Sequence, residues 1–250
     1  MVEANSEVKG SEASTFLAAS EITTATEEVK LEEGAGEDDH AQKCQIFNDW
    51  CTANGVIMPK LQYPAYFDGG LLGVRATQDI EHREAFISIP YKMLITVDAA
   101  QRHPVLGPIL SENPMTFSED EKGDWEQLSL IVFLMYEYLK GEESFWKPYL
   151  DLMPDVKFFC HWPEGLVAAT QDQNLVHYAR EYKFELREEW TSLEKVLAKY
   201  PHVFPEGAIT DKLFYKFYAQ VCTRCFGWGL PSTSMIPMAD NLNHSDVTVV

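Results

Sequence analysis

The sequence predicts an α+β fold in which short strands and longer helices follow a disordered acidic tail. Three observations carry this prediction. Residues 1–42 hold 11 acidic residues against 2 lysines and show no sustained apolar period. Residues 66–97 alternate short apolar runs with Gly, Asp and Pro, which is typical of strands and turns. From residue 125 onward, apolar side chains recur at three- and four-residue steps, which is typical of helices.

The elements can be placed along the chain from these patterns. A tail over residues 1–42 is expected to precede a folded region over residues 43–250. We expect strands over residues 71–76, 85–89 and 93–97, and helices over residues 125–139, 173–200 and 211–226. Asp211 is the expected N-cap of the last helix. A short apolar run at residues 235–238 then gives way to the polar residues 240–245.

Composition excludes several classes of protein. Only 20 Lys and Arg stand against 39 Asp and Glu, and the formal net charge is −19. Because phosphate binding needs clustered Lys and Arg, we expect no direct contact with nucleic acid and instead a protein partner that offers a basic segment. No apolar run approaches the roughly 18 residues of a membrane-spanning helix, and the amino terminus lacks a signal-peptide pattern. We therefore expect no membrane span and a cytoplasmic or nuclear location.

The cysteines indicate a reducing compartment. The chain has 5 cysteines, an odd number without a dense framework, which favours free thiols. Cys222 and Cys225 have CxxC spacing, but a structural zinc site needs four ligands and His244 is the only other candidate nearby. We expect no metal site. The two thiols are interpreted as core side chains one helical turn apart.

The stretch Met-Ile-Pro-Met-Ala-Asp-Asn-Leu-Asn-His-Ser, residues 235–245, is the most informative part of the chain. The Asn243-His244 dipeptide alone carries little information, because it occurs by chance in many proteins. In its context, however, it resembles the signature of SET methyltransferases of the RuBisCO-lysine and actin-histidine branches. In that family the pattern Pro-x-x-Asp-x-x-Asn-His closes a knotted loop over the cofactor.

Four further blocks resemble the same family in the same order. They are Gly-Val-Arg-Ala-Thr-Gln-Asp-Ile at 73–80, Ile-Ser-Ile-Pro at 87–90, Phe-Trp-Lys-Pro-Tyr-Leu-Asp-Leu-Met-Pro at 145–154 and Thr-Arg-Cys-Phe at 223–226. The resemblance covers roughly residues 44–250. It implies a SET-domain β-fold with a knotted loop and a mostly helical insert at about residues 150–218, and it implies S-adenosylmethionine as the cofactor.

The resemblance also implies where the cofactor is contacted. The family places contacts at the turn before Gly73, which here comprises Gly70, Leu71 and Leu72. Glycine adopts backbone conformations that other residues resist, which allows main-chain groups to approach a ligand closely. The family's usual glycine two positions before Gly73 is Leu71 in this chain, so the contact is expected to be shifted or weaker. Without the resemblance, these glycines indicate an ordinary hairpin turn.

Four further residues are assigned roles by the resemblance alone. Asn243 and His244 correspond to residues that contact the adenosine and amino-acid ends of the cofactor, the amide offering both a donor and an acceptor. Arg224 corresponds to the family's arginine at the cofactor and substrate channel, and Asp240 to the aspartate near the substrate amine. A salt bridge between the helix end and the loop is the alternative interpretation of Arg224 and Asp240.

The function implied by the resemblance is S-adenosylmethionine-dependent methylation of a protein, with lysine as the expected acceptor and histidine as an alternative. The reaction needs an uncharged nitrogen aligned in a dehydrated channel. The family's catalytic tyrosine follows the Asn-His loop, so it is expected beyond Val250, in a carboxy-terminally truncated chain with little or no turnover of its own. A catalytically inactive SET-derived module that binds proteins is the alternative from another class. We expect a monomer.

Overall fold

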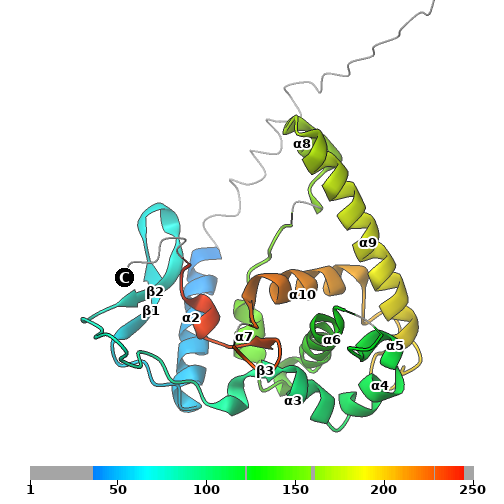
Figure 1. Cartoon of the computed structure of the whole chain (residues 1–250). Helices are drawn as coiled ribbons and strands as arrows, with labels where there is room; N and C mark the ends of the chain where they lie inside the picture. Colours follow the sequence, from blue (N-terminus) through cyan, green and yellow to red (C-terminus); the bar gives the residue numbers. More distant parts are fainter. Residues whose placement is uncertain (1–35, 122, 159–160, 228, 245–250) are drawn as a thin grey trace, which may run out of the picture. The chain divides into compact units, whose positions relative to one another are not determined.

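The computed structural model describes residues 36–121, 123–158, 161–227 and 229–244 (Figure 1). The chain divides into two units, with the boundary between Gln42 and Lys43. Helix α2 (Gly36–Ala53) includes residues 36–42, which the sequence assigned to the disordered tail. The rest of the predicted tail, residues 1–35, lies outside the described residues.

Beyond α2, short elements alternate with a few long helices (Figure 1). The helices are α3 (Val97–Arg102), α4 (Leu106–Glu112), α5 (Pro114–Phe117), α6 (Trp125–Leu139), α7 (Lys147–Leu152), α8 (Glu164–Ala169), α9 (Gln173–Leu197) and α10 (Asp211–Arg224). The strands are β1 (Leu61–Tyr66), β2 (Leu72–Ala76), β3 (Ile95–Thr96), β4 (Cys225–Phe226) and β5 (Ser234–Met235). The 3-10 helices are η1 (Asp68–Gly70), η2 (Tyr91–Met93), η3 (Gly141–Glu143) and η5 (Ala239–Asn241).

The strands form two small antiparallel sheets. β1 and β2 make a hairpin whose register shifts between Gln62 and Ala65. In the second sheet β5 lies between β3 and β4, so segments that are far apart in the sequence pair with one another. Each strand of this sheet has only two residues, and the loops leaving β5 therefore depend on other contacts for their position.

Of the expected strands, the one at residues 85–89 does not form and the one at residues 93–97 is much shorter than predicted. Residues 85–89 form no strand, and only an isolated antiparallel bridge joins Ser88 to Ile57. Arg83 has a positive φ of 66°, so the backbone turns just before this apolar run, and Pro90 follows it without a donor N–H. The expected strand at 93–97 is reduced to β3, because the side chain of Thr96 accepts the N–H of Ala99 and starts α3.

Helix α6 is the centre of the main core, with the bounds that the sequence predicted. Its residues Leu130, Ile131 and Val132 are fully buried, so three successive side chains on different faces are covered. α6 packs against α10 and α3 (Figure 1). Burial on all sides fits its strongly apolar sequence.

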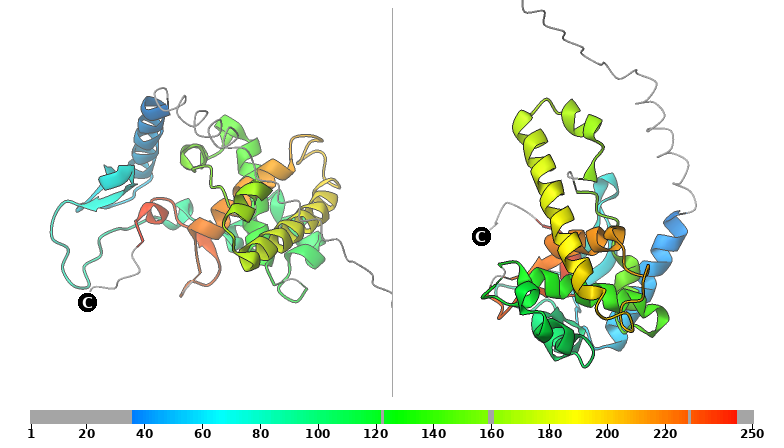
Figure 2. Two further views of the ribbon diagram at one scale, coloured as in Figure 1. Left: turned by 90° about the horizontal axis from the view of Figure 1, so that it is seen from above. Right: turned by 90° about the vertical axis from the view of Figure 1, so that its right-hand side faces the viewer.

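The helical insert has two parts. The side chain of Asp172 accepts the N–H groups of Asn174 and Leu175 and starts α9, whose carboxy-terminal half joins the main core. Pro201 follows α9 closely, and the helix ends at Leu197 before the predicted Tyr200. α8 and the first half of α9 instead share a separate small core and lie apart from the main helices (Figure 2).

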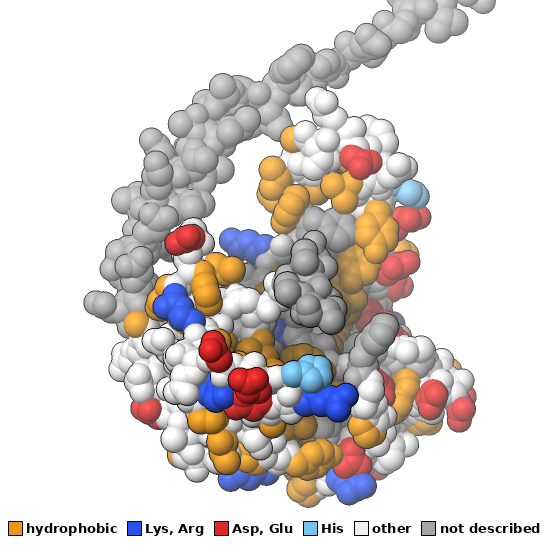
Figure 3. Space-filling view, turned by 60° about the vertical axis from the view of Figure 1, so that its left-hand side comes forward, with side chains coloured by type: hydrophobic (Ala, Val, Ile, Leu, Met, Phe, Trp, Pro, Cys, Tyr) orange, Lys and Arg blue, Asp and Glu red, His pale blue; other side chains and the backbone are white. Residues whose placement is uncertain are grey.

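That separate core consists of Val167, Val176 and Ala179. Hydrophobic side chains are exposed around it near the top of Figure 3, over α8 and the start of α9. Leu166 is 53% exposed and Tyr178 is 55% exposed.

No helix within the described part of the chain is long and apolar enough to span a membrane.

The N-cap predicted for α10 was wrong by one residue. The hydroxyl of Thr210 accepts the N–H of Leu213 at 3.2 Å, so Thr210 is the N-cap and Asp211 is the first helical residue. Thr210 has the extended backbone that an N-cap requires, whereas Asp211 is already helical. Both side chains favour a helix start, and sequence alone does not separate adjacent candidates.

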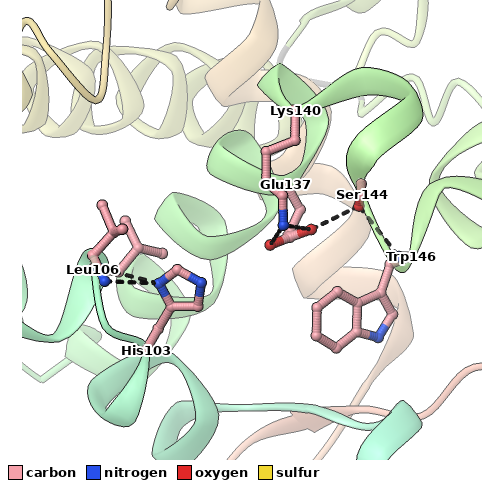
Figure 4. A network of polar contacts seen from close by, with 7 residues as sticks. His103, Leu106, Glu137, Lys140, Ser144 and Trp146 are labelled. Atoms are coloured by element: carbon pink, nitrogen blue, oxygen red, sulfur yellow. Dashed lines mark hydrogen bonds and ion pairs between the residues drawn. The ribbon is translucent and has the colours of Figure 1, made fainter.

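A buried polar network fixes the segment that leads into α7 (Figure 4). The Glu137 carboxylate is 1% exposed and accepts from Lys140 Nζ at 3.0 Å and from Ser144 Oγ at 2.7 Å. Ser144 Oγ accepts the N–H of Trp146, whose ring N–H donates to the carbonyl oxygen of Met93. The Trp-x-Pro-Tyr block is therefore anchored to α6 and to the chain before β3.

The His103 ring lies beside this network and caps the start of α4 (Figure 4). Its Nδ1 accepts the N–H groups of Val105 and Leu106, each at 3.2 Å. Burial is the main cause that lowers the pKa of His103; Glu137 opposes this shift and Lys140 adds to it. Protonation of Nδ1 would remove the acceptor of both hydrogen bonds.

We therefore expect the free energy of unfolding to fall as the pH drops below about 6.5, the ordinary pKa of histidine. The unfolded chain takes up a proton there that folded His103 resists, so stability is fully present above that pH. Urea denaturation at about pH 7.5 and pH 5.5 measures the effect. His103→Asn keeps a capping acceptor without titrating, and its loss of stability on acidification should be smaller. Equal losses in both proteins would contradict this role.

Candidate active site

The loop after β5 follows a tight path that the backbone itself defines. The N–H of Asp240 donates to the carbonyl oxygen of Ile236 at 3.1 Å, and the N–H of Leu242 donates to that of Ala239 at 3.2 Å. Met238 has a φ of 76°, which is uncommon for a residue with a Cβ atom, and its side chain is fully buried. This backbone conformation costs about 1–3 kcal/mol, and the burial of the Met238 side chain maintains it. The conformation in turn sets the path of the polar residues that follow.

Asn243 fastens the end of this loop to the β1-β2 hairpin. Its Nδ2 donates to the carbonyl oxygen of Leu72 at 3.1 Å, and its Oδ1 accepts the N–H of Val74 at 3.2 Å. The side-chain amide thus pairs with β2 as a peptide group of a neighbouring strand would. An amide has two N–H groups and two acceptor lone pairs, so one of each stays available for a ligand. We call this pairing the Asn243 clasp.

The clasp explains why position 73 is glycine. A Cβ atom at Gly73 would lie 1.6 Å from Oδ1 and 2.3 Å from Cγ of Asn243. Such distances are impossible, so the clasp requires a residue without a side chain between Leu72 and Val74. Gly73 has no unusual backbone angle that would demand glycine by itself.

The turn of the hairpin contains three of the residues predicted to contact the cofactor, Gly70, Leu71 and Leu72. Gly70 has a φ of +78° and open space around its Cα, so its conformation and not crowding favours glycine. The N–H of Phe67 donates to the carbonyl oxygen of Leu71 at 2.9 Å and closes the turn, while the Leu71 side chain is 57% exposed. The turn is an ordinary hairpin turn, and the Asn243 clasp binds the main chain directly after it. His244 follows the clasp directly and is exposed.

The second group of predicted residues forms a buried ion pair. Arg224, at the end of α10, donates to Oδ2 of Asp240 at 2.9 Å, and the Tyr149 hydroxyl donates to the same oxygen at 2.6 Å. The side chain of Asp240 is 0% exposed and that of Arg224 is 16% exposed. Burial raises the pKa of Asp240 above its ordinary value, while Arg224 and Tyr149 partly offset that shift. The salt bridge foreseen as the alternative for these residues is present.

Sequence reasoning did not select Tyr149. Its block was recognised as a resemblance, but no local signal distinguishes this tyrosine from the other aromatic residues around it. The contact with Asp240 joins residues that are 91 positions apart, so it follows from the tertiary fold. The ring is 1% exposed and stacks on Phe47 with centroids 6.0 Å apart.

The interpretation of Cys222 and Cys225 as core thiols was wrong for Cys222, whereas Cys225 packs against the main core. Cys222 is exposed and Cys225 is half-buried, because α10 ends at Arg224 and Cys225 already belongs to β4. Cys51, Cys222 and Cys225 form no disulfide among the described residues, and Cys160 lies outside the described residues. Within the described ranges, no three His, Cys, Asp or Glu side chains form a group that could hold a metal ion.

Solved structures share the fold of this chain. The SET domain of LSMT bound to lysine and AdoHcy matches with a TM-score of 0.70 and 24% identity over 84% of this chain and 45% of that one. The same domain bound to MeLysine and AdoHcy matches with a TM-score of 0.68 and 25% identity, over 82% of this chain and 45% of that one. The chain has the SET-domain fold of LSMT, which confirms the predicted fold class, and it is similar to proteins of the LSMT-like branch. No family model matches the chain.

The chain is also similar to curated actin-histidine N-methyltransferases. The actin-histidine N-methyltransferases of Homo sapiens and Rattus norvegicus are each 26% identical over 208 residues, which is 79% of this chain and 33% of each relative. The chain thus spans about a third of the length of these relatives. Rubisco LSMT bound to AdoMet matches with a TM-score of 0.67 and 25% identity, over 82% of this chain and 45% of that one.

Proposed function

We propose that the chain is the cofactor-binding SET domain of an S-adenosylmethionine-dependent protein methyltransferase. The Asn243 clasp carries the proposal, because it brings the Asn-His loop against the glycine-containing hairpin in a fold whose solved relatives hold AdoMet or AdoHcy. The clasp leaves one N–H and one lone pair of the amide for a ligand. Gly73, which has no Cβ, allows the loop and hairpin to meet.

The residues present fit such a cofactor. The turn at Gly70, Leu71 and Leu72 offers carbonyl oxygens, each with two lone pairs of which a hydrogen bond within the protein uses one at most. Asn243 offers its second N–H and second lone pair, and His244 offers an exposed polar ring. When bound, the cofactor supplies a methyl group on a positively charged sulfur. The chain has to orient that group and exclude water, because the attacking nitrogen must be uncharged and aligned.

Lysine is the proposed acceptor, and histidine is the second candidate. LSMT structures that hold lysine or MeLysine support lysine, whereas the curated relatives at 26% identity are actin-histidine N-methyltransferases. The net charge of −19 supports a basic segment around the acceptor. The catalytic tyrosine that the family carries after its Asn-His loop is proposed to lie outside the described residues.

Calorimetric titration of S-adenosylmethionine tests the proposal. The unmodified chain is expected to bind one equivalent, and a chain with both Asn243→Ala and His244→Ala is expected to bind about tenfold more weakly or not at all, a loss of about 1.4 kcal/mol or more. His177→Ala serves as the control, because it removes an exposed histidine that pairs with Glu181 on α9. Absence of binding by the unmodified chain, or equal binding by the double variant, would contradict the proposal.

A further inference from the structure

Arg75 lies on β2 directly beyond the Asn243 clasp. It follows Val74, whose N–H the clasp binds, and it is two residues away from Gly73. Side chains of alternate residues in a strand point to the same side. The Asn243 amide occupies the side to which a Cβ atom at Gly73 would point. The Arg75 side chain therefore leaves the strand on the side of the clasp.

Two contacts hold the Arg75 side chain along the hairpin. Nη2 donates to the carbonyl oxygen of Tyr66 at 2.6 Å, and Cζ lies 5.0 Å from the centre of the Phe67 ring, which attracts a cation. Tyr66 pairs with Leu72, whose carbonyl oxygen accepts from Asn243. The side chain thus runs back toward the turn, and its guanidinium reaches the same short stretch of the hairpin as the clasp.

The charge of Arg75 has no carboxylate partner in the described part of the chain. Acidic residues outnumber Lys and Arg by 39 to 20, and Lys60 at the other end of the hairpin does pair with Glu84. Arg75 is instead held by Phe67 and by a main-chain oxygen, which uses one of the five N–H groups of a guanidinium. Arg75 is exposed, so donors remain for a planar anion such as a carboxylate.

S-adenosylmethionine offers one group that suits such donors. The carboxylate of its methionine part is the only anionic group of the molecule. The sulfur and the amino group each carry a positive charge, and the adenine and the ribose are neutral. A guanidinium beside this cofactor is therefore attracted by the carboxylate and repelled by the two cationic groups.

We propose that Arg75 is a cofactor-binding residue, which donates hydrogen bonds to the carboxylate of S-adenosylmethionine. This inference rests on the proposed function, in which the cofactor lies against the Asn243 clasp. The Phe67 ring and the Tyr66 carbonyl oxygen hold the guanidinium before the cofactor binds, so little side-chain freedom is lost on binding. Arg75 adds a charged contact to the main-chain contacts of the turn.

Calorimetric titration of S-adenosylmethionine and of decarboxylated S-adenosylmethionine, in which a hydrogen atom replaces the carboxylate, tests the inference. At about 150 mM salt, where attraction to distant acidic residues is screened, the unmodified chain should bind S-adenosylmethionine about tenfold more tightly than the decarboxylated form. Arg75→Met should weaken S-adenosylmethionine by about tenfold. Its affinity for the decarboxylated form should stay the same or rise slightly, because a repelling cation is gone.

A matched control separates a direct contact from a change of overall charge. Arg187→Met removes the same charge from an exposed position on α9 and should change neither affinity. Equal losses for both ligands in Arg75→Met would indicate a disturbed hairpin and would overturn the inference, as would unchanged binding of S-adenosylmethionine. An unmodified chain that binds both ligands equally would overturn the inference and leave the proposed function intact. Failure to bind either ligand would overturn both.

Discussion

Replacement of Gly73 by alanine is expected to open the Asn243 clasp and to weaken S-adenosylmethionine binding by about tenfold or more. The new Cβ would lie 1.6 Å from Oδ1 of Asn243, so the amide must leave and both hydrogen bonds to β2 are lost. Each such bond contributes about 0.5–1.5 kcal/mol, and the free energy of unfolding should fall by about 1–3 kcal/mol. Calorimetric titration and urea denaturation measure the two effects.

The clash predicts a specific coupling between the two residues. Once Asn243 is already alanine, the same change at Gly73 meets no amide and should have little further effect on stability. Gly227→Ala is the control, because a Cβ there meets no atom within 4 Å. Additive losses in the Gly73→Ala, Asn243→Ala double variant would show that the clasp does not connect these positions.

Arg224→Met is expected to lower the free energy of unfolding by about 3–5 kcal/mol at neutral pH. The change leaves the fully buried carboxylate of Asp240 with Tyr149 as its remaining donor. It also removes the nearest positive charge, so the folded-state pKa of Asp240 rises further above its ordinary 3.8. The folded variant then binds a proton more readily than the unfolded chain, and the loss should shrink as the pH falls through that raised pKa.

Urea denaturation at about pH 8 and pH 5 tests this pH dependence. Arg102→Met is the matched control, because Arg102 pairs with Asp98 at 2.9 Å but is 81% exposed. An exposed pair of this kind contributes about 0.2–1 kcal/mol. A double variant with Asp240→Asn should recover part of the stability lost in Arg224→Met. Equal losses at both pH values would show that Asp240 is not the source of the effect.

The sequence predicted the long helices better than the strands, for a physical reason. α6 and α10 bury apolar residues at three- and four-residue steps, and this local pattern is visible in the sequence. The sheet β3-β5-β4 has strands of two residues, too short for any alternation to appear. The apolar run at residues 85–89 looked like a strand, yet it lacks a partner beyond the bridge at Ser88.

The candidate site was predicted by resemblance and completed by tertiary contacts. The motif located Asn243, Arg224 and Asp240, but it did not show that the amide binds the main chain of β2. Nor did it show that Gly73 is required by a side chain 170 residues away. Tyr149 was missed, because its contact with Asp240 depends on α7 and η5 meeting in space. Contacts of this range leave no periodic trace in a sequence.

The Asn243 clasp has a consequence for how the protein is made. It joins residues separated by 169 and 171 positions, and the ribosome synthesises the chain from its amino terminus. The β1-β2 hairpin is therefore complete long before Asn243 exists, and it must wait with its Gly73 edge unpaired while α6, α9 and α10 are added. Closure of the loop onto that edge waits until Asn243 has been synthesised, so a chain whose translation stalls before Asn243 cannot assemble the site.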